Sequence, residues 1–314
     1  MALNYGKELE FNSEYFNLYQ VSKNTYGAIS KENSGMGGNA GFIDLGDFAV
    51  LIDTTMKKEA AEDLRDAVIK YTGKEPKFIV ITHYHLDHVM GNSVFDSSIL
   101  IITSERTLNN IKVENGKRIE DIKSTSAEEI EKMEGALKIE KDEEKHKEIE
   151  NNLNFIKFVK DEGFALRYPN LCFKEELILH GKNGDLHLLA FQKAHTDGDV
   201  VVYVPDDKIL FAGDLLFARR DPWLGSGDPE GWISVIDEIS AMNITTVIPG
   251  HGTLASKSEF SLERKYIIEI IQLAKNHLKT GEPIKREDFS PDLKKWTSPV
   301  LQWNIDFLVT FLKK

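Results

Sequence analysis

Three histidines and an aspartate lie close together in the stretch ITHYHLDHVMGN, which spans residues 81–92. His83 and His85 are two positions apart, so at the end of a strand their side chains would point to the same side. Asp87 and His88 follow in the next turn. Imidazole and carboxylate groups are ligands of Zn²⁺ and similar divalent ions. Four such residues directly after an apolar run therefore predict a metal site.

Three further ligand-type residues occur far along the chain, each near an expected strand. His195 lies in AHTDGDVVVYVP, Asp214 ends ILFAGD, and His251 lies between the glycines of VIPGHG. The charge of Asp214 amid apolar neighbours would be costly to bury without a partner. Each residue taken singly is more typical of a satisfied core or turn position. Together with the first stretch they offer enough ligands, at the carboxyl ends of strands, for two metal ions.

The surrounding sequence predicts the elements that position these groups. GFIDLGDFAVLIDT reads as two short strands joined by a tight turn. TTMKKEAAEDLRDAVIKYTG predicts an amphipathic helix that stops at Gly73. KFIVITH predicts a strand buried on both faces. The histidine-rich loop thus leaves the carboxyl end of a strand, where open α/β sheets bind ligands.

A second β-rich half begins near Leu171. It contains LHLLAFQKAHT and VVVYVPDDKILFAGD, in which PDD predicts a hairpin turn. PEGWISVIDEISAM and SKSEFSLERKYIIEIIQLAKNHLKTG then predict helices. Because strand, helix and strand recur in both halves, we expect an α/β (α+β) fold class with two packed sheets and helices outside. Residues 1–314 are expected to form a single domain.

Two segments are expected to be additions to this domain. Residues 104–163 include SAEEIEKMEGALKIEKDEEKHKEIE, in which 15 of 25 residues are charged and apolar residues recur at helical spacing. This predicts an inserted charged helical segment, with disorder as the alternative for its middle. Residues 286–314 are expected to form a helical tail that packs on the body. The alternative for the tail is an interface or a pocket wall.

Composition excludes several kinds of partner. The formal net charge of −12 argues against nucleic acid, because phosphate contacts need a basic face, and against anionic lipid. No stretch approaches the roughly 18 apolar residues of a membrane span, and the start of the chain lacks a signal-peptide core. We therefore expect a cytoplasmic protein with a small-molecule substrate. Its single cysteine, Cys172, excludes an internal disulfide.

On these residues the sequence resembles the metallo-β-lactamase-fold hydrolase superfamily. The resemblance rests on LID, HYHLDH, AHTDGD, FAGD and PGHG, and covers about residues 53–252. It implies a four-layer αββα sandwich with metals at one edge and Asp53 orienting a ligand imidazole through its free N–H. It also implies one metal held by His83, His85 and His195, another held by Asp87, His88 and His251, and Asp214 as the bridge.

This resemblance implies a dinuclear metal-dependent hydrolase that uses a metal-bridging hydroxide on a small ester-like substrate: a thioester, lactone, phosphodiester or amide. Two divalent ions ~3.5–4 Å apart would lower the pKa of a shared water. Asp87 and Asp214 are the expected catalytic residues, Asp87 as proton shuttle. Zn²⁺ is the first expectation for both ions, with Mn or Fe as alternatives. Relatives that are true β-lactamases carry cysteine or serine near position 214, so only weak or promiscuous β-lactamase activity is expected.

Two other functions and several substrate contacts stay open. An iron-dependent sulfur or persulfide oxygenase, and a non-catalytic metal-binding module, are the alternatives. After the bridging aspartate, Arg219 and Arg220 could clamp an anionic group and Trp223 could form an apolar wall, although a plain surface loop fits as well. His195 follows His88 at a distance of 107 residues, which exceeds the simple family pattern. The insertion is therefore a candidate lid, and insertion and tail are candidate homodimer contacts.

Overall fold

The computed structural model describes residues 5–296 and 299–313, and within them the strands form two sheets. The first described sheet has eight strands paired in chain order: β1 (Lys7–Glu8), β2 (Phe16–Gln20), β3 (Thr25–Ser30), β4 (Ala40–Asp44), β5 (Ala49–Ile52), β6 (Pro76–Val80), β7 (Leu100–Ser104) and β8 (Leu171–Phe173). The second, over the same residues, has six in this order: β14 (Ala255–Ser256), β13 (Thr246–His251), β12 (Ile209–Phe217), β11 (Val200–Val204), β10 (Gly184–Ala190) and β9 (Glu176–Gly181).

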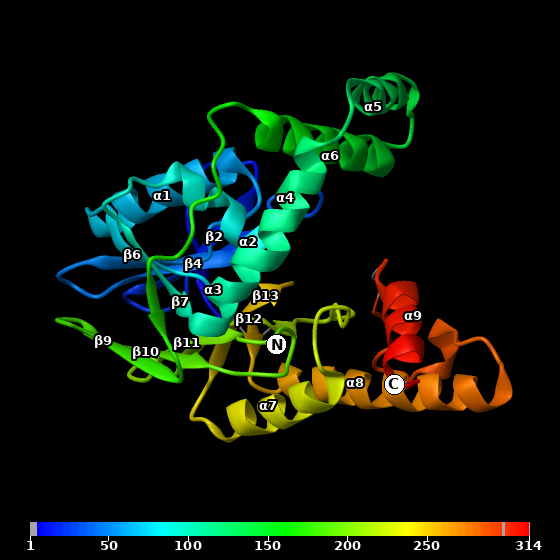
Figure 1. Cartoon of the computed structure of the whole chain (residues 1–314). Coiled ribbons are helices and arrows are strands. Elements are labelled where there is room, and N and C mark those ends of the chain that lie inside the picture. The colour runs from blue at the N-terminus through cyan, green and yellow to red at the C-terminus, as the bar shows by residue number, and fades with distance from the viewer. Residues whose placement is uncertain (1–4, 297–298, 314) are drawn as a thin grey trace.

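Helices cover the outer faces of both sheets (Figure 1). Helix α1 (Lys58–Thr72) lies over the first sheet, and α7 (Pro229–Ala241) and α8 (Glu259–Thr280) lie over the second. The other helices are α2 (Leu86–Val89), α3 (Glu105–Asn110), α4 (Gly116–Lys123), α5 (Ala127–Ile139), α6 (Glu143–Lys160) and α9 (Leu301–Phe311), with short 3₁₀ turns η1 (Met90–Val94) and η3 (Arg286–Asp288) and a π-helical turn η2 (Ile111–Asn115).

Buried apolar side chains form three clusters that separate four layers. Leu51 of β5 and Leu64 of α1 belong to the cluster between the first sheet and its helix. Val50 and Leu188 belong to the cluster between the two sheets. Trp232 of α7 belongs to the cluster under the second sheet. Leu51 and Val50 enter different clusters because successive strand residues point to opposite faces. The predicted fold class and αββα sandwich are confirmed.

The amphipathic helix predicted before the histidine-rich loop is α1. Its buried residues lie at helical spacing on one face and are mostly alanine, which lets the helix approach the sheet closely: Ala60, Ala61, Leu64, Ala67 and Val68. The helix ends at Gly73, which caps it in the left-handed conformation at φ 70°. Strand β6 follows, parallel to β5, so both strands end at the same edge of the first sheet.

Strand β12 differs from the prediction that Asp214 ends a strand. It continues to Phe217, with register shifts against the parallel β13 on both sides of Gly213. Gly213 has φ 52°, a conformation that costs glycine little. The strand continues because this buries the apolar side chains of Leu215 and Leu216 completely. Asp214 therefore lies within an irregular stretch of the strand rather than at its end.

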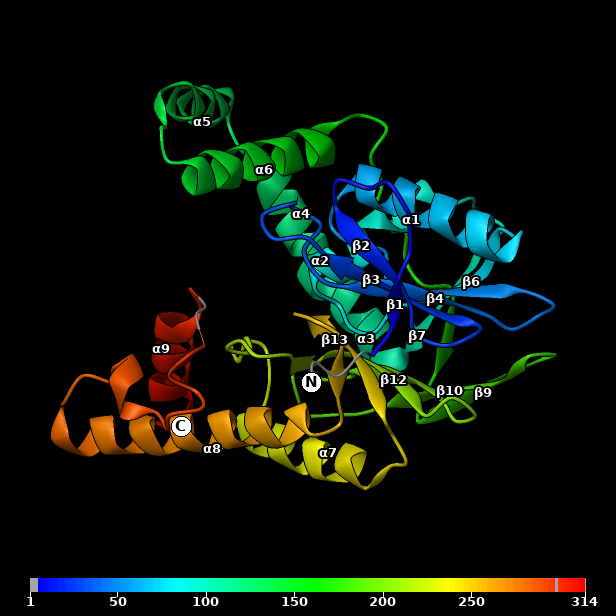
Figure 2. The same cartoon turned by 180° about the vertical axis from the view of Figure 1, so that it is seen from behind.

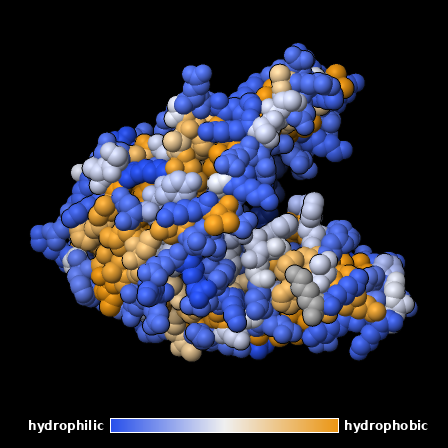
Figure 3. Space-filling view, in the orientation of Figure 1, coloured by the Kyte–Doolittle hydropathy of each residue, from blue (hydrophilic) through white to orange (hydrophobic). Residues whose placement is uncertain are grey.

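Two groups of helices flank the sandwich. Helices α4, α5 and α6 form an arm on one side, and α9 packs on α8 on the other (Figures 1 and 2). The helices predicted for residues 104–163 are present, and Figure 3 shows the surface hollowed between this arm and the C-terminal helices. In both ribbon views α2 and the ends of β12 and β13 lie toward the inner end of this hollow. In the described part of the chain, no helix is long and apolar enough to cross a membrane.

Candidate metal centre

The seven predicted ligand residues converge into two clusters. The first cluster consists of His83, His85, His195 and Asp214, and the second of Asp87, His88 and His251. Within each cluster the ligand atoms lie within 4.8 Å of one another. They come from the ends of β6 and β13, from α2, from β12 and from the loop before β11. The residues predicted from distant motifs are thus brought together, while their metal roles stay predictions.

Asp214 belongs to the first cluster and also contacts the second. Its Oδ2 atom lies 3.4 Å from His195 Nε2 in the first cluster and 3.3 Å from His251 Nε2 in the second. Its Oδ1 atom lies 3.2 Å from His88 Nε2. The side chain is nearly fully buried, so no bulk water screens these contacts. A carboxylate in this place can share its two oxygens between two cations.

The imidazole nitrogens of the first cluster point at one another. His85 Nδ1 lies 3.1 Å from His83 Nε2 and 2.9 Å from His195 Nε2. On the other side of its ring, His195 Nδ1 lies 3.1 Å from the carbonyl oxygen of Trp223. A carbonyl only accepts, so Nδ1 carries the proton and Nε2 presents a lone pair to the cluster.

The rings of His85 and His83 each contact a hydroxyl group on the side away from the cluster. His85 Nε2 lies 3.0 Å from Ser226 Oγ, and His83 Nδ1 lies 3.0 Å from Thr82 Oγ1. The Thr82 hydroxyl donates to Asp53 Oδ2 at 2.7 Å, so it accepts from the His83 ring. The rings of His83 and His195 therefore direct an unprotonated nitrogen inward, and His85 Nδ1 faces both of them.

Asp53 orients a ring in each cluster. It accepts a hydrogen bond from His88 Nδ1 at 2.7 Å, as well as those from the Thr82 backbone N–H and hydroxyl. It reaches His88 directly and His83 through Thr82. Asp53 adopts φ 58°, a left-handed conformation that aspartate tolerates better than most residues. The orienting role predicted for Asp53 stays a prediction, and this geometry supports it.

The residues present fit two divalent ions. His88 Nε2 and Asp214 Oδ1 are buried and make no hydrogen bond, although they lie only 3.2 Å apart. Unsatisfied buried polar atoms are rare and point to a missing partner. The ligand nitrogens of His83, His85 and His195 also lie close enough together to share one cation. Imidazole and carboxylate ligands suit Zn²⁺ and similar ions.

Burial and charge divide the histidines into two groups. Burial lowers the pKa of His195 to about 3 and that of His85 to about 4, so both rings are neutral at pH 7. Burial also lowers the pKa of His251, but the carboxylates of Asp214 and Asp87 outweigh it and raise that pKa to about 9. Without a cation, the second cluster balances its carboxylates with protons.

This protonation predicts that zinc binding at the second cluster depends on pH. A ligand imidazole must be neutral, so the metal displaces the proton that His251 holds below its pKa of about 9. We expect zinc affinity to rise by at least about tenfold per pH unit below that pKa, because the carboxylates around His88 also raise its pKa. Competition with a chelating dye between about pH 7 and about pH 10 measures this.

The metal-free protein should show the opposite trend in stability. A folded-state pKa of His251 raised from 6.5 to about 9 adds stability that is complete below pH 6.5 and lost as pH rises through 9. The melting temperature of the metal-free protein should therefore fall over this range, and that of the zinc-loaded protein should not fall with it. In the dye competition, a zinc affinity that does not change between about pH 7 and about pH 10 would refute the protonation of His251.

Sequence reasoning missed several residues around the clusters. Thr82 and Ser226 hold ligand rings, as described above. Gly38 and Gly250 matter because a Cβ on either would collide with the ring of His88 or the carboxylate of Asp214, respectively. The motif PGHG suggested glycines for a sharp turn, and Gly252 at φ 90° fits that. Close approach of Gly250 has no such sequence signal.

The predicted substrate contacts lie in different surroundings. Trp223 meets the first cluster through its carbonyl, and its indole N–H donates to Ser226 Oγ at 3.2 Å. Arg219 is mostly exposed and lies 3.4 Å from Glu259 of α8. Arg220 is half-buried. Substrate binding by these three residues stays a prediction.

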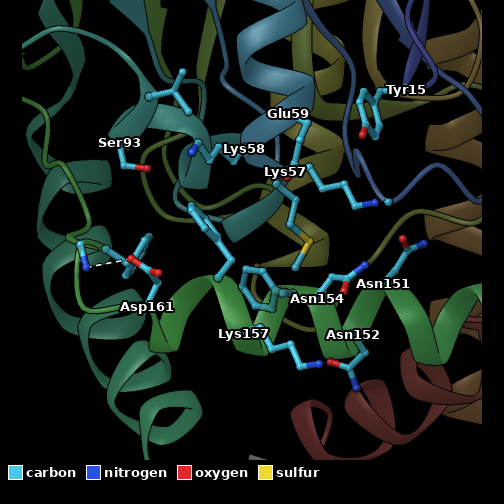
Figure 4. A pocket seen from close by; sticks show the side chains of 17 residues that line it. Tyr15, Lys57, Lys58, Glu59, Ser93, Asn151, Asn152, Asn154, Lys157 and Asp161 are labelled. Atoms are coloured by element: carbon cyan, nitrogen blue, oxygen red, sulfur yellow. Dashed lines mark hydrogen bonds between the residues drawn. The ribbon is translucent and has the colours of Figure 1, made fainter. Parts of the chain in front are cut away.

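A separate cavity of about 920 Å³ lies between α6 and the beginning of α1 (Figure 4). Met56 and Phe155 line it together with polar groups that include Lys57. None of the seven predicted ligands is among its described lining residues. Gly35 lines the cavity, and Gly37 in the same loop packs against Asp87. The cavity and the metal centre thus share a loop but not a space.

The fold and the sequence are similar to those of known proteins. The family model for the metallo-beta-lactamase superfamily matches residues 34–100 and 131–251. A metallo-beta-lactamase from Pontibacter korlensis is 21% identical with a TM-score of 0.59, over 81% of this chain and 99% of that chain. The metallo-beta-lactamase FIM-1 from Pseudomonas aeruginosa, in a mono-zinc form, is 17% identical with a TM-score of 0.58, over 81% and 95%. These likenesses show the fold, and because the family model matches more than half of its length, the chain belongs to the metallo-β-lactamase superfamily.

Proposed function

We propose that this chain is a dinuclear metal-dependent hydrolase of a small ester-like substrate. The observation that carries the proposal is that two ligand clusters share the buried carboxylate of Asp214. Burial keeps the imidazoles of the first cluster neutral, and His83 and His195 present lone pairs inward, which is the state that a metal requires. Zn²⁺ is the first candidate for both positions.

The chain's own residues supply proton transfer and orientation. When bound, two divalent ions at such a centre polarise a carbonyl or phosphoryl oxygen and lower the pKa of water. Asp87 is partly exposed, and its Oδ2 atom lies 3.3 Å from His251 Nε2. Burial raises its pKa, but His88 and His251 outweigh this and hold it well below the usual range. Asp87 is therefore ionised at neutral pH and can accept a proton at Oδ2 and pass it to the leaving group.

The hollow between the arm and the C-terminal helices supports a small substrate. The ring centroids of Tyr84 and His85 lie 4.7 Å apart. Those of Trp223 and Trp303 of α9 lie 6.3 Å apart. Such rings offer an apolar wall beside the first cluster. Within the proposed class we keep thioester, lactone, phosphodiester and amide bonds as candidates. Both similar structures are named metallo-beta-lactamases, and we propose at most weak activity of that kind here.

Metal analysis of protein purified without added metal tests the proposal. We expect two divalent ions per chain, mainly zinc. One iron per chain would instead favour an oxygenase, and a metal-free protein that takes up no zinc would refute a metal centre. A panel of a chromogenic cephalosporin, a thioester, a homoserine lactone and bis-p-nitrophenyl phosphate then ranks the substrates. Loss of turnover on chelation and its return with zinc would support the hydrolase, whereas turnover that survives chelation would refute it.

A further inference from the structure

One loop holds two of the three imidazoles in the first cluster. We define the Trp223 loop as residues 221–226. The Trp223 carbonyl accepts from His195 Nδ1 at 3.1 Å, and Ser226 Oγ lies 3.0 Å from His85 Nε2. The indole N–H of Trp223 also donates to Ser226 Oγ, so the two contacts are linked. The conformation of this loop therefore sets the direction of two ligand rings.

The Trp223 loop is fixed by a side chain from the C-terminal helix. Asn304 of α9 is fully buried. Its amide Nδ2 donates to the Pro222 carbonyl at 2.7 Å, and its Oδ1 accepts from the Leu224 backbone N–H at 3.0 Å. These two bonds bracket Trp223 on both sides. A side-chain amide suits this place because it donates and accepts at once.

A second tie from the C-terminal segment supports the same loop. Arg286 of η3 binds the buried carboxylate of Asp221 through two nitrogens, one of them at 2.8 Å. Arg286 and Asn304 both lie beyond residue 251, where the family match ends. The C-terminal segment thus fixes a loop of the metal centre from outside the matched region.

We propose that Asn304 is a positioning residue for the first metal cluster, acting through the Trp223 loop on His195 and His85. The proposal rests on the proposed metal centre and names an element that sets its affinity. In the second cluster, the ring of His88 is held by Asp53 and not by the Trp223 loop. Loss of Asn304 should therefore weaken one metal position and spare the other, which a general loss of stability would not do.

The test measures zinc affinity at each position separately. His251→Ala leaves the first cluster intact, and His195→Ala removes one of its ligands and leaves the second. Adding Asn304→Ala to the His251→Ala protein should weaken zinc binding about 10-fold or more in competition with a chelating dye, the scale for loss of an outer contact to a ligand. In the His195→Ala protein the same change should alter zinc affinity by less than about threefold. The visible absorption of Co²⁺ in the first protein should change as its rings reorient.

Companion variants separate positioning from folding. Asn304→Asp is nearly isosteric and keeps the acceptor for Leu224 but loses the donor to the Pro222 carbonyl, so it should weaken zinc binding at the first cluster as Asn304→Ala does. Gln302→Ala is an exposed control on the same helix. Val68→Ala is a buried control in the apolar cluster between the first sheet and α1. Neither control should change zinc affinity. Equal losses at both positions, or no loss at the first, would overturn the role of Asn304. If the His251→Ala protein itself bound no zinc, the metal centre would fail instead.

Discussion

Replacing Asp214 with alanine should remove metal from both clusters and most of the turnover while leaving the fold intact. Asp214 is the side chain that contacts His195, His251 and His88 at 3.2–3.4 Å. We expect fewer than one tightly held ion per chain, and a fall in kcat/KM of at least about 10²–10³-fold, the scale for loss of a preorganised electrostatic group. Metal content after dialysis and kcat/KM on the best substrate of the panel measure both effects.

Asp197→Ala is the matched control for that variant. Asp197 lies two residues after a ligand histidine, but its carboxylate is half exposed and pairs with Arg106 at 2.6 Å. Its loss should leave metal content and kcat/KM within about twofold, because exposed ion pairs contribute little. Circular dichroism of each metal-free variant checks the fold. Two retained ions and unchanged turnover in Asp214→Ala would disprove the bridging role.

The convergence of the ligand residues could be predicted because each lies in or near a recognisable strand. His83 leaves a continuous apolar run, and the parallel pairing of β5 with β6 brings Asp53 to the same edge. The pairing of β12 with β13 does the same for Asp214 and His251. Near-continuous apolar runs such as β5 and β12 then predict strands that are covered on both faces. Local pattern and strand direction therefore predicted the strands and the shared edge of the candidate ligands, whereas the four-layer order and the metal roles came from the family resemblance.

The outer contacts of the ligands could not be predicted from the same patterns. The Trp223 carbonyl that holds His195 is a backbone group, and any residue type could supply it. Asn304 lies 80 residues beyond Leu224, with which it bonds, and reads in the sequence as one polar residue in an apolar helix. Its role appears only when α9 packs on α8. The sequence suggested Trp223 as an apolar wall, and the backbone carbonyl at that position was missed.

For the predicted insertion, residues 104–163, the helices could be predicted from the sequence but their placement could not. Its helices follow from apolar spacing, and Leu153, Ile156 and Val159 are the buried face of α6. Their direction relative to the sandwich depends on contacts such as Asn151 Nδ2 with the carbonyl of Asn33. No local rule predicts which loop a helix from an insertion will meet. The cavity beneath α6 was therefore missed as well.

Replacing Asp53 with asparagine should weaken both metal positions, and the second more than the first. Asparagine matches the size of Asp53 and tolerates its left-handed φ of 58°. The carboxylate, however, accepts three hydrogen bonds, two of them from Thr82 and one from His88. An amide has one oxygen, so one orientation sets its N–H against the Thr82 backbone N–H and the other sets it against the Nδ1–H of His88. The second orientation changes the tautomer of His88. The ring would move its proton to Nε2, the nitrogen that a metal needs.

We expect zinc affinity at the second cluster to fall about 10–100-fold in Asp53→Asn, and a smaller loss at the first cluster through Thr82 and His83. Competition in the His195→Ala and His251→Ala proteins separates the two positions. Asp44→Asn is the control, because Asp44 ends the neighbouring strand β4 and pairs with Lys74 at 3.0 Å, away from the ligand rings. Equal zinc affinity in Asp53→Asn and the parent protein would mean that the tautomer of His88 is set by something other than Asp53.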